Sequence, residues 1–196
     1  MIECIRVIGE DIPPFLIHKG KHILQDLVEL IHHSRATLAC SNNGWSNDEI
    51  GLEWLKHFNK HTRPVGAYRL LILDEHGSHA TFAFTNYARE NKIVLVYLPP
   101  YTTHRLQPLD VAIFAPLATY YSELVHEHAK YSGVGVFKRE WITWIQLARE
   151  KANVQANVIS AWAATRLIPF DPNRVLSKLK KVKVCDIRIL IGLYKG

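Results

Sequence analysis

The sequence predicts an α/β fold, and three observations in the middle of the chain support this prediction. Residues 68–73 and 93–98 are short, almost unbroken apolar runs, as expected of strands buried on both faces. The residues between them have helical spacing. Asp74 directly follows the first run, and Asp110 follows the second after a polar loop. Because ligands bind beyond the carboxyl ends of strands in open α/β sheets, both aspartates are candidates for a metal-binding site.

The first 34 residues predict a β-hairpin followed by a segment with helical spacing. Residues 1–8 and 12–18 have the pattern of two strands, and Gly9-Glu10-Asp11 supplies the turn between them. In residues 22–34 the helical spacing comes from four apolar positions, Leu24, Leu27, Val28 and Ile31.

Residues 45–61 predict an amphipathic helix. Ser46 and Glu49 have the spacing of a capping box, and Trp45 and Ile50 stand at the hydrophobic-staple positions. One apolar stripe follows, formed by Ile50, Trp54, Leu55 and Phe58. His57 and His61 are four residues apart, as in some metal sites, but the sequence offers no third ligand. We therefore interpret these two histidines as part of an exposed polar face.

Further helices are predicted on both sides of the second strand. Ser78 can cap a helix that ends near Glu90 and buries Phe82, Ala83, Tyr87 and Ala88. A second helix begins at Leu109, after Pro108, and Pro116 must kink it or start a new segment. Two later apolar faces complete the helical region: Phe137, Trp141, Trp144, Ile145 and Ala148, then Val154, Val158, Ala161, Trp162 and Thr165. We interpret their tryptophans as core residues rather than base-stacking platforms.

The composition is that of an ordinary soluble domain. The chain has 196 residues, of which 48% are hydrophobic and 21% charged, enough for one domain with a real core. No apolar run has transmembrane length, so we expect no membrane association. Cys4, Cys40 and Cys185 are scattered and odd in number, which suits a reducing compartment.

Positive charge is concentrated at the C-terminus. Of the formal net charge of +6, residues 171–196 carry +5, from seven basic residues against Asp171 and Asp186. Such a tail favours contact with nucleic-acid phosphates, although a solvated tail without a partner is an equal alternative. The candidate contact residues are Arg174, Lys178, Lys180, Lys181 and Lys183. Residues 185–194 are apolar enough to dock against the rest of the chain, at a place that the sequence does not identify.

Residues 71–79 and 98–110 carry a resemblance to a known family. Leu71-Ile72-Leu73-Asp74-x-His76-Gly77-Ser78-His79, followed by a block from Leu98-Pro99-Pro100 to Leu106-Gln107-Pro108-Leu109-Asp110, resembles the catalytic core of the DDE superfamily. Within it, the pogo, Tigger and jerky group of transposase-derived proteins is most similar. The resemblance implies a domain over residues 1–179, incomplete at its N-terminus, and a separate basic tail over residues 180–196.

The resemblance also implies a fold and a chemistry. The family has a ribonuclease-H-like mixed sheet flanked by helices, and three acidic residues hold two Mg²⁺ or Mn²⁺ ions for DNA cleavage and strand transfer. Asp74 matches the second acid and Asp110 the third. The first belongs to a strand expected upstream of Met1, so the sheet would lack its first, central strand. The hairpin and the strand ending at Asp74 would then expose unpaired edges, unless they paired directly with each other.

Three functions fit these residues. The first is a transposase-derived DDE endonuclease domain that acts on DNA in the nucleus and is inactive as this fragment. In this function Arg105 and Gln107 are further candidates for nucleic-acid contact. An equal alternative is that these two residues form hydrogen bonds within their loop. The second is a non-enzymatic, domesticated DNA- or protein-binding module. The third is a metal-dependent phosphoesterase using Asp74, His76, His79 and Asp110. By spacing alone the two aspartates would be ordinary helix caps. The oligomeric state stays open, a homo-oligomer included.

Overall fold

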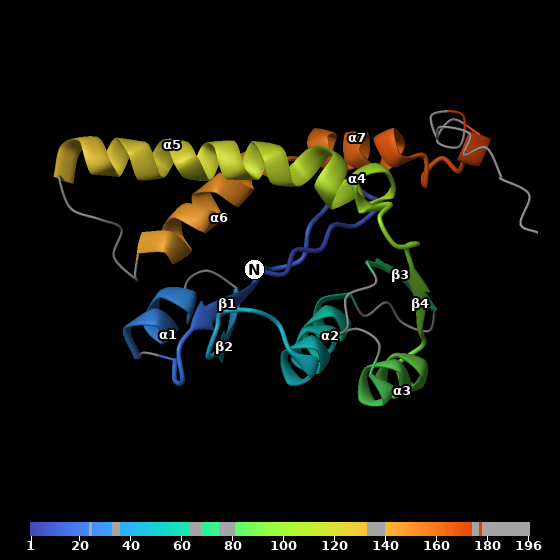
Figure 1. Ribbon diagram of the computed structural model, residues 1–196, viewed down its shortest axis with the longest axis horizontal. Coiled ribbons are helices and arrows are strands. Elements are labelled where there is room, and N and C mark those ends of the chain that lie inside the picture. The colour runs from blue at the N-terminus through green and yellow to red at the C-terminus, as the bar shows by residue number, and fades with distance from the viewer. Residues whose placement is uncertain are drawn as a thin grey trace, which may run out of the picture.

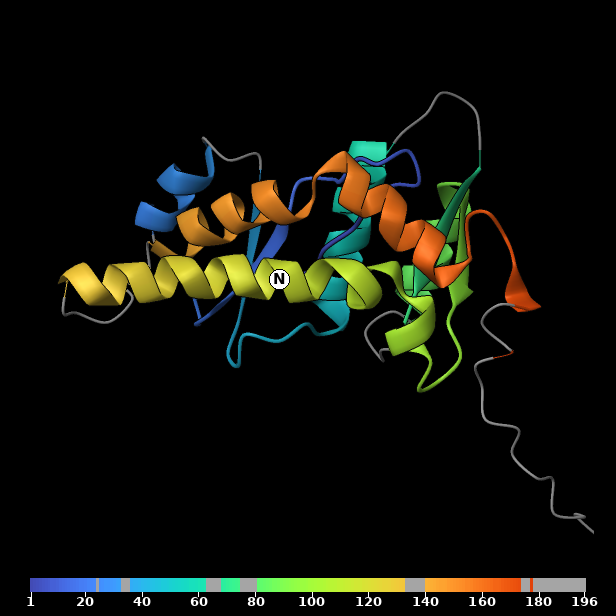
Figure 2. The same cartoon turned by 90° about the horizontal axis from the view of Figure 1, so that it is seen from above.

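The α/β class predicted from the sequence is confirmed by a computed structural model, which describes residues 1–23, 25–32, 36–62, 68–74, 81–132, 140–173 and 177 (Figure 1). The elements in chain order are β1 (Phe15–Lys19), α1 (Gln25–His32), β2 (Thr37–Ser41), α2 (Asp48–Thr62), β3 (Arg69–Leu73), α3 (Phe82–Glu90), β4 (Ile93–Tyr97), α4 (Thr103–Leu106), the π-helix η2 (Leu109–Ile113), α5 (Phe114–Ser132), α6 (Glu140–Ala152) and α7 (Gln155–Thr165). The long helix α5 packs against α6, and α7 packs against η2, on one side of the strands, whereas α2 and α3 lie on the other (Figures 1 and 2).

The described strands form two separate parallel pairs, and the ribonuclease-H-like mixed sheet that joins them stays a prediction. In the first pair Phe15 of β1 lies opposite Thr37 of β2, and in the second Arg69 of β3 lies opposite Ile93 of β4. Strand β2 was not predicted, because Thr37-Leu38-Ala39-Cys40-Ser41 has a weak apolar pattern. These residues form a strand because they pair with β1.

Residues 1–14 form an antiparallel arm that turns where the sequence predicts. Isolated bridges join Ile2 to Phe15 and Ile5 to Asp11. Gly9 has φ +90, and a Cβ there would lie 2.4 Å from Cγ of Gln155, so both the turn and the close approach of α7 favour glycine. The arm does not pair with β3. Among the described strands, β3 is hydrogen-bonded to β4 alone. Direct pairing of hairpin and β3 is therefore excluded for the described residues.

Helix α2 supplies the centre of the largest core cluster. The predicted stripe is confirmed, since Ile50, Trp54, Leu55 and Phe58 are all buried. The predicted cap is wrong: Asn47 Oδ1 accepts the Ile50 N–H at 2.9 Å, and Trp45 is 73% exposed. Hydrogen bonds from Ser41 Oγ to the Trp45 carbonyl and from the Trp45 N–H to Asn43 hold the preceding turn. This turn moves the start of the helix one residue further along the chain.

Two other helices refine the sequence predictions. Helix α1 confirms the helical spacing of its segment, with Leu27 fully buried. Helix α3 is capped by Thr81, whose Oγ1 accepts the Phe84 N–H at 3.2 Å, while Ser78 lies outside the described residues. The buried face consequently contains Phe84 and Ala88, and Phe82 is 84% exposed. The predicted burial of Phe82 and Ala83 is wrong for this reason.

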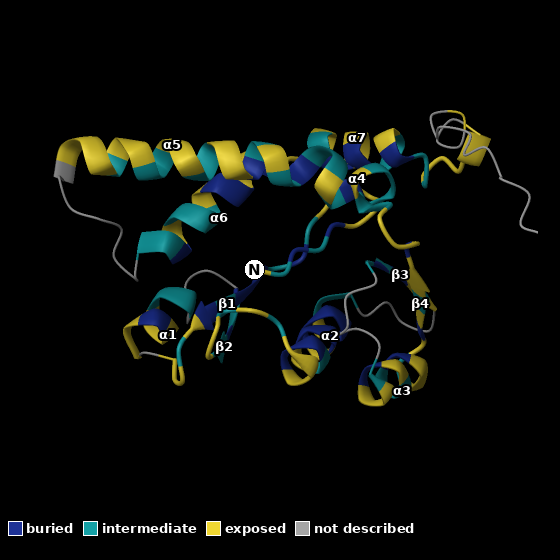
Figure 3. Cartoon of the chain, viewed as in Figure 1, coloured by how far each residue is buried: buried dark blue, intermediate teal, exposed yellow. Residues whose placement is uncertain are grey.

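The C-terminal helices follow the predicted apolar faces except at Val154, which is the N-cap of α7 and is 45% exposed. Pro116 lies in the first turn of α5, directly after η2, so the expected interruption takes the form of a π-helical turn. Ala148, Val158, Ala161 and Thr165 are buried, and Trp141, Trp144 and Trp162 are partly buried against core residues, whereas Phe137 lies outside the described residues. Most of α5 away from η2 is exposed or only partly buried (Figure 3).

Candidate functional site

A cleft separates the N-terminal arm from β3. Its volume is about 850 Å³, and its walls include arm residues 1–7, β3 with Asp74, and residues 107–110 at the start of η2, together with parts of α2, α7 and the turn before α2. Asp74 and Asp110, far apart in the sequence, therefore line one cleft. Asp74 is partly buried at the end of β3, and Asp110 is exposed in the first turn of η2.

Two loop residues, Arg105 and Gln107, were predicted to contact nucleic acid. Gln107 lies in the same cleft as the two aspartates, whereas Arg105 does not line it. Gln107 lines the cleft, and its Oε1 is buried without a hydrogen-bond partner among the described residues. Arg105 lies on α4, a single helical turn within the predicted polar loop, and its Nε donates to His104 Nε2 at 3.1 Å. The basic candidates Arg174, Lys178, Lys180, Lys181 and Lys183, and the whole 180–196 segment, lie outside the described residues.

The donor atoms of the cleft suit a hard divalent cation. Two carboxylates and one unpaired amide oxygen are the oxygen ligands that Mg²⁺ and Mn²⁺ prefer. Within the described ranges, no group of three or more His, Cys, Asp and Glu side chains is arranged to hold a metal. His76 and His79 of the phosphoesterase hypothesis lie outside those ranges.

Arg69, at the start of β3, connects this strand to α2 and α3. Its Nη1 donates to Asn59 Oδ1 at 2.8 Å and to Thr62 Oγ1 at 3.2 Å, and its Nη2 donates to the Asn91 carbonyl. Asn59 is buried and donates in turn to Tyr87 Oη and Asn91 Oδ1. This network orients the strand that ends at Asp74. This network was not predicted from the sequence, in which its one signal is a cationic residue within an apolar run.

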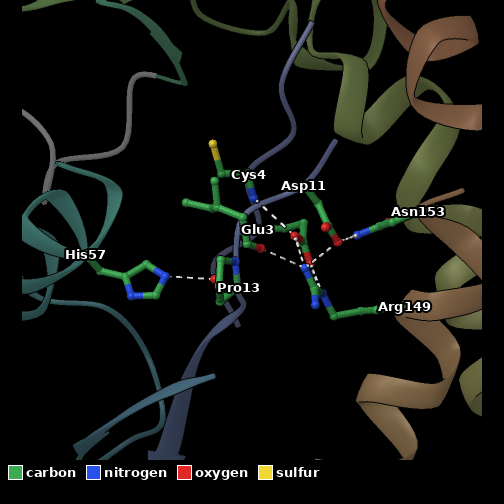
Figure 4. Close-up of polar contacts among 8 residues, drawn as sticks. Glu3, Cys4, Asp11, Pro13, His57, Arg149 and Asn153 are labelled. Carbon is green, nitrogen blue, oxygen red and sulfur yellow. Dashed lines mark hydrogen bonds and ion pairs between the residues drawn. The ribbon is translucent and has the colours of Figure 1, made fainter. Parts of the chain in front are cut away.

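A buried ion-pair network attaches the arm to α6 (Figure 4). Arg149 Nε and Nη2 donate to the two Glu3 carboxylate oxygens at 2.6 and 2.7 Å, and Nη2 also contacts Asp11 at 2.8 Å and the Ile12 carbonyl at 3.0 Å. Burial raises the pKa of Glu3, and the hydrogen bonds from Arg149 oppose this shift. Glu3 lines the cleft but is bound to Arg149, so it is not available as a third metal ligand.

His57 attaches the arm to α2, which corrects its predicted place on an exposed polar face. The ring is buried, and its Nε2 lies 2.7 Å from the Pro13 carbonyl (Figure 4). Its Nδ1 lies 2.9 Å from Thr37 Oγ1. Because a carbonyl can only accept, Nε2 carries the proton and Nδ1 accepts from the threonine hydroxyl in the neutral ring. Burial lowers the pKa of His57, and His61 and Lys60 lower it further.

We expect the free energy of unfolding to fall as the pH drops below about 6.5, the ordinary pKa of histidine. The pKa of His57 is lowered in the folded chain, so the unfolded chain binds more protons in this window and acid favours unfolding. Urea denaturation between pH 5 and 7.5 should show a weaker pH dependence in His57→Gln than in the unmodified chain. His104→Gln, at an exposed position, should retain it. Equal pH dependence in His57→Gln and the unmodified chain would contradict the assignment.

Comparisons with known proteins agree with the predicted family. Residues 1–162 match the family model described as DDE superfamily endonuclease. The chain is 36% identical over 192 residues to a Cochliobolus lunatus protein named MFS-type transporter clz9, covering 97% of this chain and 20% of that protein. It is 26% identical over 151 residues to human and mouse proteins named Pogo transposable element with KRAB domain, covering 71% of this chain and 24% of each.

The chain thus spans about a fifth to a quarter of the length of these relatives. No solved structure matches it. Among the described helices, none has both the length and the apolarity to cross a membrane. The family match covers most of the chain, and the two Pogo relatives support the pogo-like group within it. The chain belongs to the DDE superfamily endonuclease family.

Proposed function

We propose that this chain provides two carboxylate ligands, Asp74 and Asp110, to a two-metal site for DNA strand cleavage in a ribonuclease-H-like, transposase-derived domain of the nucleus. The observation that carries the proposal is that both aspartates line one cleft. The family match and the Pogo relatives support DNA as the partner. Two parallel strand pairs, each flanked by helices, are compatible with a ribonuclease-H-like domain.

In this proposal some residues of the cleft bind the cations, and others position the aspartates that bind them. Asp74 and Asp110 would hold Mg²⁺ or Mn²⁺, which in such sites activates the attacking oxygen and stabilises the leaving one. Gln107 Oε1 can accept a hydrogen bond from a water or a nucleic-acid group in the cleft. Arg69 keeps the Asp74 strand in place through its bonds to α2 and the α3 cap. Asp110 lies in the first turn of the helical segment η2–α5, where it can reach a cation in the cleft.

A second candidate is a non-enzymatic module that binds DNA or protein. It is favoured by the side chains of the cleft: among the described residues, the other carboxylate beside Asp74 and Asp110 is Glu3, which is bound to Arg149. Metal binding and plasmid cleavage distinguish this candidate from the first.

Binding of Mn²⁺ tests the proposed site. We expect Mn²⁺ titrations followed by electron paramagnetic resonance to show a bound ion, and the Asp74→Asn, Asp110→Asn double variant to lose it, because amides are weaker ligands than carboxylates. Asp48→Asn is the matched control, since Asp48 is also exposed in the first turn of a helix but does not line the cleft. Equal Mn²⁺ binding by the double variant would refute the proposal.

We also expect weak, sequence-independent DNA binding that depends on the basic tail. The +5 charge of residues 171–196 can neutralise several phosphates. The logarithm of the affinity should then fall with the logarithm of the salt concentration, with a slope of about −0.9 per phosphate contact on duplex DNA. Fluorescence anisotropy of a labelled duplex, measured at several salt concentrations, gives this slope. A chain truncated after Asp171 that binds as tightly as the full chain would show that the tail is irrelevant.

A further inference from the structure

The connection between β4 and α4 begins beside the strand end that carries Asp74. Strands β3 and β4 are parallel, so their carboxyl ends lie at the same edge of the pair. Leu98 N donates to the carbonyl of Leu73, the residue before Asp74, at 2.8 Å, and residues 99–102 follow at once. At its other end the connection enters α4, which packs against η2, the helix of Asp110 (Figure 1). The connection therefore runs from one proposed metal ligand towards the other.

Within this connection, Tyr101 has a backbone conformation that tyrosine rarely adopts. Its φ is +62, in the left-handed region, where a residue with a Cβ is strained and glycine is favoured. The Pro99 carbonyl closes the turn, because it accepts from the Thr102 N–H at 3.3 Å and from Thr102 Oγ1 at 2.7 Å. Tyr101 is the third residue of this turn, where glycine is usual when φ is positive. The turn holds Tyr101 in place although the residue is strained.

The Tyr101 side chain contributes little to the stability of the fold. It is 95% exposed, the highest fraction among the large hydrophobic residues that the structure describes. Tyr101 does not line the cleft between the arm and β3, so its exposure is not a consequence of that cleft. Strained residues cluster at functional sites, where a contact with a ligand accounts for a side chain that packing does not explain. The open faces of the Tyr101 ring are therefore candidates for such a contact.

Cationic side chains follow Tyr101 in α4. His104 is exposed and Arg105 partly buried, and Arg105 Nε donates to His104 Nε2 at 3.1 Å, which orients the guanidinium. Proteins that bind single-stranded nucleic acid combine these two features, because bases stack on an aromatic ring while cations contact the phosphates. A base inside a duplex has both faces covered by its neighbours. An exposed ring can therefore stack on an unpaired base and not on a base within a duplex.

We propose that Tyr101 stacks on an unpaired base of the DNA strand whose phosphate lies at Asp74 and Asp110. The inference rests on the proposed function and adds a residue that positions the strand. The Tyr101 ring holds the base at the edge of the β3–β4 pair, and Arg105 contacts the adjoining phosphate. Because every base has a face that can stack, Tyr101 confers a preference for unpaired DNA rather than for a particular sequence.

Affinities for single-stranded and duplex DNA of equal length test this inference. Fluorescence anisotropy of labelled DNA with the full chain, measured in EDTA, makes the result independent of metal binding. Tyr101→Ala should bind oligothymidine roughly 5- to 100-fold more weakly than the unmodified chain, the effect expected from the loss of one stacked base. Its affinity for the duplex should be unchanged. Tyr101→Phe should keep both affinities, because phenylalanine provides the same stacking surface.

Two further variants separate stacking from effects on the fold. Tyr101→Gly removes the ring together with the strain, so the midpoint of urea unfolding should not fall. It should nevertheless bind oligothymidine as weakly as Tyr101→Ala. Tyr131→Ala is the matched control and should bind both DNAs normally. Tyr131 is 78% exposed and lies near the C-terminal end of α5, whereas η2 precedes the first residue of α5, roughly 25 Å of helix away.

The possible failures are distinguishable. Undiminished binding of oligothymidine by Tyr101→Ala would refute the stacking and leave the proposed function intact, since Mn²⁺ binding is measured separately and does not involve the ring. Equal losses for single-stranded and duplex DNA would refute an unpaired base as the ligand. Failure of the unmodified chain to bind either DNA would overturn this inference together with DNA as the partner in the proposed function.

Discussion

Replacing Arg149 by methionine should lower the free energy of unfolding by about 3–5 kcal/mol, the usual cost of removing one partner of a buried ion pair. Arg149 and Glu3 are both buried, and the two hydrogen bonds between them are short. Without the guanidinium, the Glu3 carboxyl stays buried with no partner for its charge, and Asp11 and the Ile12 carbonyl each lose a hydrogen bond. The arm would also lose its attachment to α6, so the wall of the cleft should loosen.

Urea denaturation of the full chain at pH 7 measures this effect. Arg6→Met is the matched control, because the Arg6–Glu10 ion pair lies within the same arm but is exposed, and its loss should change stability by less than about 1 kcal/mol. Combining Glu3→Gln with Arg149→Met should recover part of the loss, because the buried charge is then removed together with its partner. A cost below about 1 kcal/mol for Arg149→Met would mean that the pair is dispensable.

The isolated chain should not nick supercoiled plasmid in Mg²⁺ or Mn²⁺. Asp74 and Asp110 line the cleft, but the other described carboxylate of the cleft, Glu3, is bound to Arg149. A missing metal ligand removes several kcal/mol of transition-state stabilisation, and each ~1.36 kcal/mol corresponds to about tenfold in rate. Cleavage should therefore not rise above background.

An Asp74→Ala, Asp110→Ala variant, assayed on the same gel, separates true activity from contaminating nuclease. Nicking by the unmodified chain that disappears in this variant would contradict the expectation. Such a result would mean that a further carboxylate completes the site.

The sequence alone predicted the features that depend on residues close together in the chain. The apolar runs that became β3 and β4, the buried stripe of α2, the turn at Gly9 and the helix beginning near Asp110 were all visible as local patterns. Local periodicity and turn chemistry are properties of a short stretch of chain, so they can be recognised before the fold is known. The aspartates themselves were identified by their position after strands and by the family motif.

Tertiary structure alone decided which residues meet. Glu3 and Arg149 lie 146 positions apart, and no local pattern connects them. His57 was assigned to an exposed face because its helix offered no third ligand, whereas the arm supplies Pro13 and buries the ring. The cleft exists because the arm bonds to α6 and α2 rather than to β3, so that two strand edges stay apart. Buried polar groups take the partners that packing places beside them, and packing is settled by the whole chain at once.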